Sequence, residues 1–220
     1  MSAAPDPTTL RPGPVSNPSA QRQPATLAPI GRQAFALQPF SNGVAELAGI
    51  RIEGWLQRQE SHLNLSFELH GPDRHDPASR DQSILWPPAG GEPVRRDGLW
   101  QHTCLEWFIA RRGEAAYWEF NLAPNGDWNV YTLAGYRQDL RADPDYGALP
   151  LLTFSDEQGG NDFRVRAPLP AALAAAQPGA LELAVTAVVE QRNGALSYWA
   201  LHHGGAEADF HRRDGFRLRI

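Results

Sequence analysis

Two glutamates that flank a short turn are the residues of this sequence best suited to chemistry. Glu106 and Glu119 each belong to a run in which apolar and polar residues alternate. If Arg112-Gly113 forms a two-residue hairpin loop, Glu106 pairs directly with Glu119 on the neighbouring strand. Two opposed carboxylates repel each other unless a cation or a shared proton lies between them. Arg96, Arg137 or a bound metal ion could supply that cation.

A second turn extends this polar face and adds aromatic rings to it. Asn125-Gly126 between two alternating runs is a strong hairpin signal. A two-residue loop there pairs Glu119 with Thr132 and puts Trp128 on the same face. The predicted polar face consists of Glu106, Phe108, Tyr117, Glu119, Asn121, Trp128 and Thr132. The opposite face, which is typical of a core, consists of Leu105, Trp107, Ile109, Trp118, Phe120, Leu122, Tyr131 and Leu133.

The mixture of groups on the polar face suits a polyhydroxylated ligand. Sugar hydroxyls bind to carboxylate and amide oxygens, and the apolar faces of sugar rings pack against aromatic side chains. The alternative interpretation is an ordinary solvated face on which one Arg–Glu pair is structural.

The elements that must position these residues are antiparallel strands. Alternation with a period of two predicts strands over residues 50–57, 63–69, 103–110, 116–123, 128–133, 151–154, 163–167, 181–189, 196–202 and 215–220. Only residues 170–176 look helical, and prolines on both sides limit them to a turn or two. Repeated hairpins with turn signals at short intervals predict an all-β sandwich or barrel.

The composition of the chain limits the classes of partner and of structural bond that it can have. The net charge is −5 and the twenty basic residues, all arginine, are scattered among acids, so no basic stripe suggests nucleic acid. The single cysteine, Cys104, excludes an internal disulfide and a thiolate zinc site. Residues 1–28 are rich in proline and predict a disordered tail ahead of one domain over residues 29–220. No export signal and no membrane-length apolar run is visible, so we expect a soluble cytoplasmic protein.

Longer motifs carry a family resemblance. They are DGLWQHTCLEWF (97–108), YWEFNLAPNGDW (117–128), GYR (135–137), AVVE (187–190), SYWALH (197–202) and DFH (209–211). Together they resemble the bacterial DOMON-like domains, which are similar to the family 9 carbohydrate-binding modules. The resemblance runs from about Phe35 to Phe216 and departs where His203-Gly204, instead of proline, follows His202. It implies an immunoglobulin-like antiparallel β-sandwich that binds a sugar or a haem.

The leading hypothesis is a non-catalytic module that binds a carbohydrate or a similar polar small molecule on one sheet face. Ligand contacts are expected from Arg96, Trp100, His102, Glu106, Glu119, Asn121, Trp128, Tyr136, Arg137, Trp199 and His202. An interaction domain with no small ligand is one alternative, and the sequence leaves the oligomeric state open.

Haem is the other alternative within the resemblance. The only methionine is Met1, so a haem would need two axial histidines from His102, His202, His203 and His211. The sequence predicts no cofactor and no metal site, because the neighbours His202 and His203 point to opposite faces of a strand.

Catalysis is not expected. Opposed residues on adjacent strands have Cβ atoms only about 4.5–5.5 Å apart on one wall, whereas a glycosidase places its carboxyl groups on either side of the scissile bond. No nucleophile-elbow, zinc-protease, Walker or Rossmann motif is present.

Overall fold

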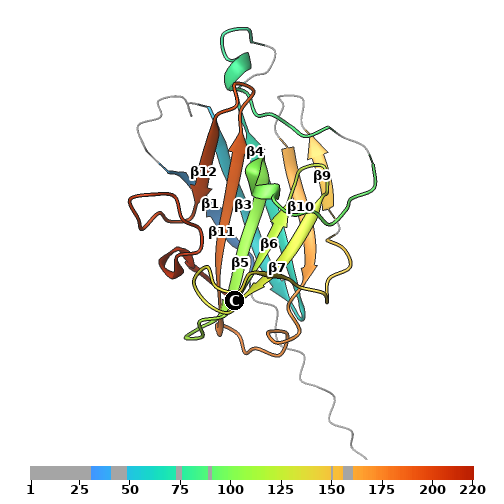
Figure 1. Cartoon of the computed structure of the whole chain (residues 1–220), viewed down its shortest axis with the longest axis vertical. Coiled ribbons are helices and arrows are strands. Elements are labelled where there is room, and N and C mark those ends of the chain that lie inside the picture. The colour runs from blue at the N-terminus through green and yellow to red at the C-terminus, as the bar shows by residue number, and fades with distance from the viewer. Residues whose placement is uncertain (1–30, 41–48, 73–75, 89–90, 150, 156–160) are drawn as a thin grey trace, which may run out of the picture.

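The structure, a computed structural model, describes residues 31–40, 49–72, 76–88, 91–149, 151–155 and 161–220 (Figure 1). The predicted tail over residues 1–28 lies outside this range. In the described part, two antiparallel sheets are stacked face to face (Figure 1). The predicted all-β antiparallel sandwich is therefore confirmed.

The first sheet has five strands. Its order is β1 (Gln33–Ala36), β3 (Arg51–Gln59), β4 (His62–His70), β10 (Asn161–Pro168) and β9 (Leu151–Ser155).

The second sheet has eight strands and carries the predicted polar face. Its order is β2 (Gln38–Pro39), β12 (Leu196–Ala200), β11 (Leu181–Glu190), β5 (Cys104–Arg111), β6 (Tyr117–Leu122), β7 (Trp128–Leu133) and β8 (Arg141–Ala142), and β13 (Leu218–Arg219) pairs with β11. Three short 3-10 helices, η2 (Arg80–Gln82), η3 (Leu99–Gln101) and η4 (Arg213–Gly215), lie in the connections.

The main core fills the space between the sheets. Because side chains alternate across a strand, every second residue of β5, β6 and β11 points into it. The rings of Trp107 and Phe120 stack there with centroids 4.8 Å apart. Each such fully buried apolar side chain stabilises the fold by about 1.5–3 kcal/mol. The outer face of the second sheet carries a smaller apolar cluster of its own, which includes Phe108, Tyr117 and Phe216.

The predicted pairing of β5 with β6 is wrong by two residues. Glu106 pairs with Asn121, and Glu119 pairs with Phe108. The connection between the paired residues spans residues 111–116, so it is longer than a two-residue loop. It contains a turn in which the Glu114 N–H donates to the Arg111 carbonyl and Gly113 has a φ of 80°. A shift of two residues preserves the faces, and the two glutamates become diagonal instead of direct neighbours.

The predicted pairing of β6 with β7 is wrong by one residue, which reverses the faces of β7. The backbone N–H of Ala123 donates to the carbonyl of Asp127 at 2.8 Å, so three residues form the loop. Gly126 takes the left-handed φ of 95° that such a loop requires. Trp128 consequently lies in the core, and Tyr131 and Leu133, predicted to be core residues, share the outer face with Glu119.

Smaller differences lie at the edges. Residues 170–176 form hydrogen-bonded turns instead of a helix. Of residues 215–220, only the end pairs with β11, through β13 and the reciprocal hydrogen bonds of Ile220 with Leu181. The alternation pattern missed β1, β2 and β8, which have four residues or fewer. None of the helices in the described ranges is long and apolar enough to cross a bilayer.

Candidate functional site

A pocket of about 380 Å³ lies on the outer face of the second sheet. Its floor is formed by side chains from five neighbouring strands: Glu106, Phe108, Glu119, Leu133, Val188 and Tyr198. Its walls come from η3, from the loop between β7 and β8, and from the segment after β12: Trp100, Arg137, Leu140, Ala208, Phe210 and His211. Residues more than 100 positions apart in the chain therefore meet in one concavity.

Glu106 lies on the floor and is 2 % exposed. Its Oε2 accepts a long hydrogen bond from the Thr186 hydroxyl at 3.4 Å, and its Oε1 has no partner among the described residues. Burial raises the pKa of Glu106 well above its usual range, and the nearby charge of Glu119 raises it further.

Glu119 is 5 % exposed and occupies the diagonal position on β6. Its Oε1 accepts a hydrogen bond from the Asn121 amide at 2.7 Å, whereas Oε2 has no hydrogen-bond donor in the described chain. Burial raises the pKa of Glu119, although the Asn121 hydrogen bond and the Arg137 charge partly oppose this. The floor thus offers two buried carboxyl oxygens that no protein group satisfies.

His211 faces Glu119 from the wall. Its Nδ1 lies 4.0 Å from the free carboxyl oxygen and forms a hydrogen bond of 2.9 Å with the Tyr117 hydroxyl. Burial lowers the pKa of His211 to about 4, with a smaller effect of the Arg137 charge in the same direction. The imidazole is therefore neutral near pH 7 and cannot serve as the cation for Glu119.

Asp209 joins two segments of the wall to each other through side-chain hydrogen bonds. It accepts hydrogen bonds from the Tyr136 hydroxyl and from Arg137 Nη2, the second at 2.8 Å. Burial opposes the charge of Asp209, but these bonds lower its pKa overall. The Arg137 guanidinium thereby directs one of its donors to Asp209, and the segment that carries His211 is tied to the loop after β7.

Aromatic rings form the apolar part of the pocket. Trp100 is 38 % exposed and packs edge-on against Tyr131, with centroids 5.9 Å apart. Tyr198 is equally exposed and packs in the same way against Phe210 at 6.1 Å. Two accessible rings consequently stand beside the buried carboxyl groups.

The structure brings four of the predicted site residues into the lining, and a fifth supports them. Trp100, Glu106, Glu119 and Arg137 line the pocket, and Asn121 holds Glu119 from beneath. Tyr136 lies at the periphery, where it is exposed and bonded to Asp209.

The remaining predicted residues lie elsewhere, for identifiable reasons. Trp128 and Trp199 point into the core, because the register of β7 and the alternation of β12 turn them inward. Three further residues stand outside the lining: Arg96, which pairs with Asp127, His102, which pairs with Glu190, and the half-buried His202.

Sequence reasoning did not assign Tyr198, Phe210 and His211 to the site. Tyr198 lies on the face of β12 opposite Trp199, so the alternation that places one ring in the core places the other outside. Phe210 and His211 occur in the DFH motif that contributes to the family resemblance, and no periodicity marks them because they lie in a loop.

The histidines considered for haem or metal are dispersed among other partners. His203 Nε2 lies 2.9 Å from the Gln38 carbonyl, and His211 bonds to Tyr117. In the described ranges, three possible metal donors gather instead on the first sheet.

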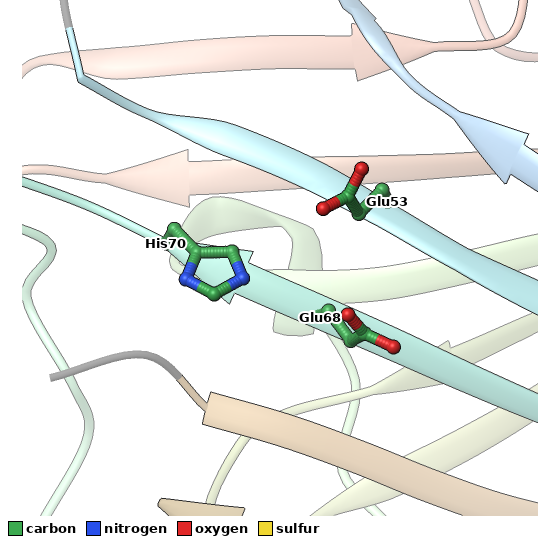
Figure 2. A group of neighbouring side chains, drawn as sticks. All are labelled: Glu53, Glu68 and His70. Carbon is green, nitrogen blue, oxygen red and sulfur yellow. The ribbon is translucent and has the colours of Figure 1, made fainter. Parts of the chain in front are cut away.

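Glu53, Glu68 and His70 lie on the outer face of β3 and β4, with donor atoms within 4.8 Å of one another (Figure 2). This is a donor set that Zn²⁺ accepts. Arg51 Nε already binds Glu53 at 3.1 Å, so part of the negative charge is balanced without an ion.

Comparisons with known proteins bear on the fold. No family profile and no curated protein matches the chain in sequence, so membership of the DOMON-like domains stays a prediction. The chain is similar in structure to a provisionally named carbohydrate-binding protein from Bacteroides uniformis, with a TM-score of 0.55 and 10% identity over 84% of each chain. At this identity the likeness establishes the sandwich fold alone.

Lower scores relate the chain to a family 9 carbohydrate-binding module from Caldicellulosiruptor kristjanssonii. For the complex of that module with cellotriose the TM-score is 0.42, with 12% identity over 77% of this chain and 72% of that chain. For the complex with glucose it is 0.34, with 12% identity over 69% and 66%.

Proposed function

We propose that this chain is a non-catalytic binding module whose pocket on the second sheet holds a carbohydrate. One observation carries the proposal: two buried carboxyl oxygens without partners lie beside two half-exposed aromatic rings, Trp100 and Tyr198. Carboxyl groups accept hydrogen bonds from sugar hydroxyls, and aromatic rings pack against the apolar faces of sugar rings.

Two further observations support this class of ligand. The volume of about 380 Å³ is within the range of small-molecule sites. The similar fold of the Bacteroides uniformis protein, which is named for carbohydrate binding, agrees with the class that the sequence resemblance implies.

The arrangement of the glutamates favours binding over hydrolysis. Glu106 and Glu119 stand on adjacent strands of one sheet, so both approach a ligand from the same side. Glycosidases place their two carboxyl groups on opposite sides of the bond that breaks. A sugar in this pocket would therefore be held and not cleaved.

A thermal-shift screen of the full chain against mono- and oligosaccharides tests the proposal. A ligand that binds the folded state raises the melting temperature by mass action. Trp100→Ala should reduce the affinity for a hit about tenfold, because it removes an aromatic contact. Leu196→Ala is the matched control, since Leu196 is similarly exposed and lies outside the pocket. No shift with any sugar, or equal binding by both variants, would contradict the proposal.

A further inference from the structure

The floor of the pocket has more buried carboxyl groups than cations to balance them. Glu106 Oε1 and Glu119 Oε2 are both buried and both lack a partner among the described residues. A buried carboxylate without a counter-charge or a donor is costly in free energy. Such groups are few in native structures, and a bound ion, water or ligand is one explanation for each of them.

Of the described residues, one cation, Arg137, lies within reach of the floor, but it makes no hydrogen bond to the free oxygen of either glutamate. Its charge lowers the pKa of Glu119, and its Nη2 is bonded to Asp209 at 2.8 Å. His211 is neutral near pH 7 because burial lowers its pKa to about 4. The other titratable groups around the pair can become negative but not positive: Cys104 from β5, Tyr117 from β6 and Tyr131 from β7. In the ligand-free chain, protons on the pair and the partly shared charge of Arg137 balance the two carboxyl groups, and a cationic group of a ligand can replace those protons.

The hydrogen-bond donors and acceptors of the floor also favour a cationic ligand group. The Asn121 amide, the polar donor nearest to the glutamates, is engaged with Glu119 Oε1. A ligand hydroxyl brings acceptor lone pairs as well as one donor, and few floor donors remain for those lone pairs. An ammonium group has three donors and no acceptor, so it matches two free carboxyl oxygens.

The walls suit a cation too. Phe108 on the floor and Trp100, Tyr198 and Phe210 around it present aromatic rings, whose faces attract positive charge. We infer that the ligand of this pocket is an amino sugar whose primary ammonium group binds between Glu106 and Glu119. This inference rests on the proposed function, because it specifies which carbohydrate the same site takes.

Isothermal titration of the full chain with matched sugars tests the inference. The probes are glucosamine, glucose and N-acetylglucosamine, followed by chito-oligosaccharides with free amines, their N-acetylated forms and cello-oligosaccharides. Free amines should bind at least about tenfold more tightly than the matched neutral sugars, since charge-assisted hydrogen bonds exceed neutral ones. Neutral sugars that bind as tightly as the amines would overturn the inference and leave the proposed function intact. If none of the six binds, both proposals fail for these sugars.

Replacing Glu106 tests where the ammonium group of the ligand binds. Glu106→Gln keeps the size of the side chain and removes its charge, so the ratio of the amine affinity to the neutral-sugar affinity should fall at least about tenfold. Glu190→Gln is the control, because Glu190 pairs with His102 outside the pocket and should retain the preference. An unchanged preference in Glu106→Gln would overturn the assignment of the ammonium position.

A second measurement needs no variant. A protonated amine favours the ionised form of the carboxyl pair, so its binding should lower the raised pKa of the pair and displace protons when the titration is made at a pH near that pKa. Titrations in buffers of different ionisation enthalpy should then show proton release with glucosamine but not with glucose. Equal proton release for both sugars would contradict an ammonium at the glutamates.

Discussion

At the scale of single residues, burial places Glu106 and Glu119 under electrostatic strain that a ligand can relieve. Both carboxyl groups have pKa values above the ordinary one because of burial, and neither has a full set of hydrogen-bond partners. In a solvated position each would gain little from a ligand, since water already satisfies it. In the proposed function, their burial would make a ligand's hydrogen bonds to them favourable, and it should also make the stability of the ligand-free domain depend on pH.

We predict that the ligand-free domain loses stability as the pH rises through the raised pKa of Glu106, and above pH 6.5 no titration of His211 opposes this loss. A raised pKa means that folded Glu106 binds protons over a range in which the unfolded chain has released them. Stability then decreases with rising pH above the unfolded value of about 4.3. His211, whose pKa is lowered from 6.5 to about 4, has the opposite effect, but only below pH 6.5.

Urea unfolding of the wild type, Glu106→Gln and the control Glu190→Gln at several pH values measures this effect. The loss above pH 6.5 should be smaller in Glu106→Gln and unchanged in the control. The other titratable groups near the pair keep their charge near neutral pH: Cys104, Tyr117, Arg137 and Asp209. If the free energy of unfolding decreased with pH equally in the wild type and in Glu106→Gln, the carboxyl pair would not be the source of the pH dependence.

At the scale of elements, the sequence predicts the strands but not the loops that set their register. Alternation reveals β5, β6 and β7 because each has one face in the core, and burial is a property of the strand's own residues. The Asn125-Gly126 signal, by contrast, is compatible with two-residue and three-residue loops, and the extra residue reverses every side chain of β7. The error placed Trp128 on the predicted polar face and Tyr131 on the predicted core face.

Gly126 should be essential for this register. Its φ of 95° is strained for any residue with a side chain, and an added Cβ would lie 2.9 Å from Pro93 Cγ. Gly126→Ala is expected to lower the free energy of unfolding by about 1–2 kcal/mol. Gly147→Ala, at a position with open space and no positive φ, should change it by less than about 0.5 kcal/mol in chemical denaturation. Equal effects of the two substitutions would contradict a role for the loop conformation.

The wall formed by the segment after β12 could not be predicted from periodicity, because it is held by individual bonds and not by a repeating face. Asp209 provides two of these bonds, to Tyr136 and Arg137. Asp209→Ala should weaken carbohydrate binding about tenfold through loss of the wall. Hydrogen exchange should speed up over residues 205–212 and stay unchanged in β5 and β11. Unaltered exchange in the segment would show that other contacts hold it.

At the scale of the whole molecule, the binding site and the core occupy opposite faces of one sheet. The second sheet uses its inner face for packing against the first sheet and its outer face for the pocket. Substitutions in the pocket should therefore alter binding without unfolding the domain, and substitutions in the core should do the reverse. The tryptophans provide a direct comparison, since chemically identical side chains lie on both faces.

Trp100→Ala and Trp199→Ala should consequently have opposite phenotypes. Trp199 is 3 % exposed and its Nε1 donates to the Ser197 hydroxyl at 2.9 Å, so its removal leaves a cavity and costs about 3–5 kcal/mol of stability. Trp100 is 38 % exposed, so its removal should cost less than about 1 kcal/mol and still reduce affinity about tenfold. Thermal unfolding and sugar titration of both variants measure the two effects separately. If Trp199→Ala retained stability but lost binding, the ligand would have to lie between the sheets, and the outer pocket would not be the site.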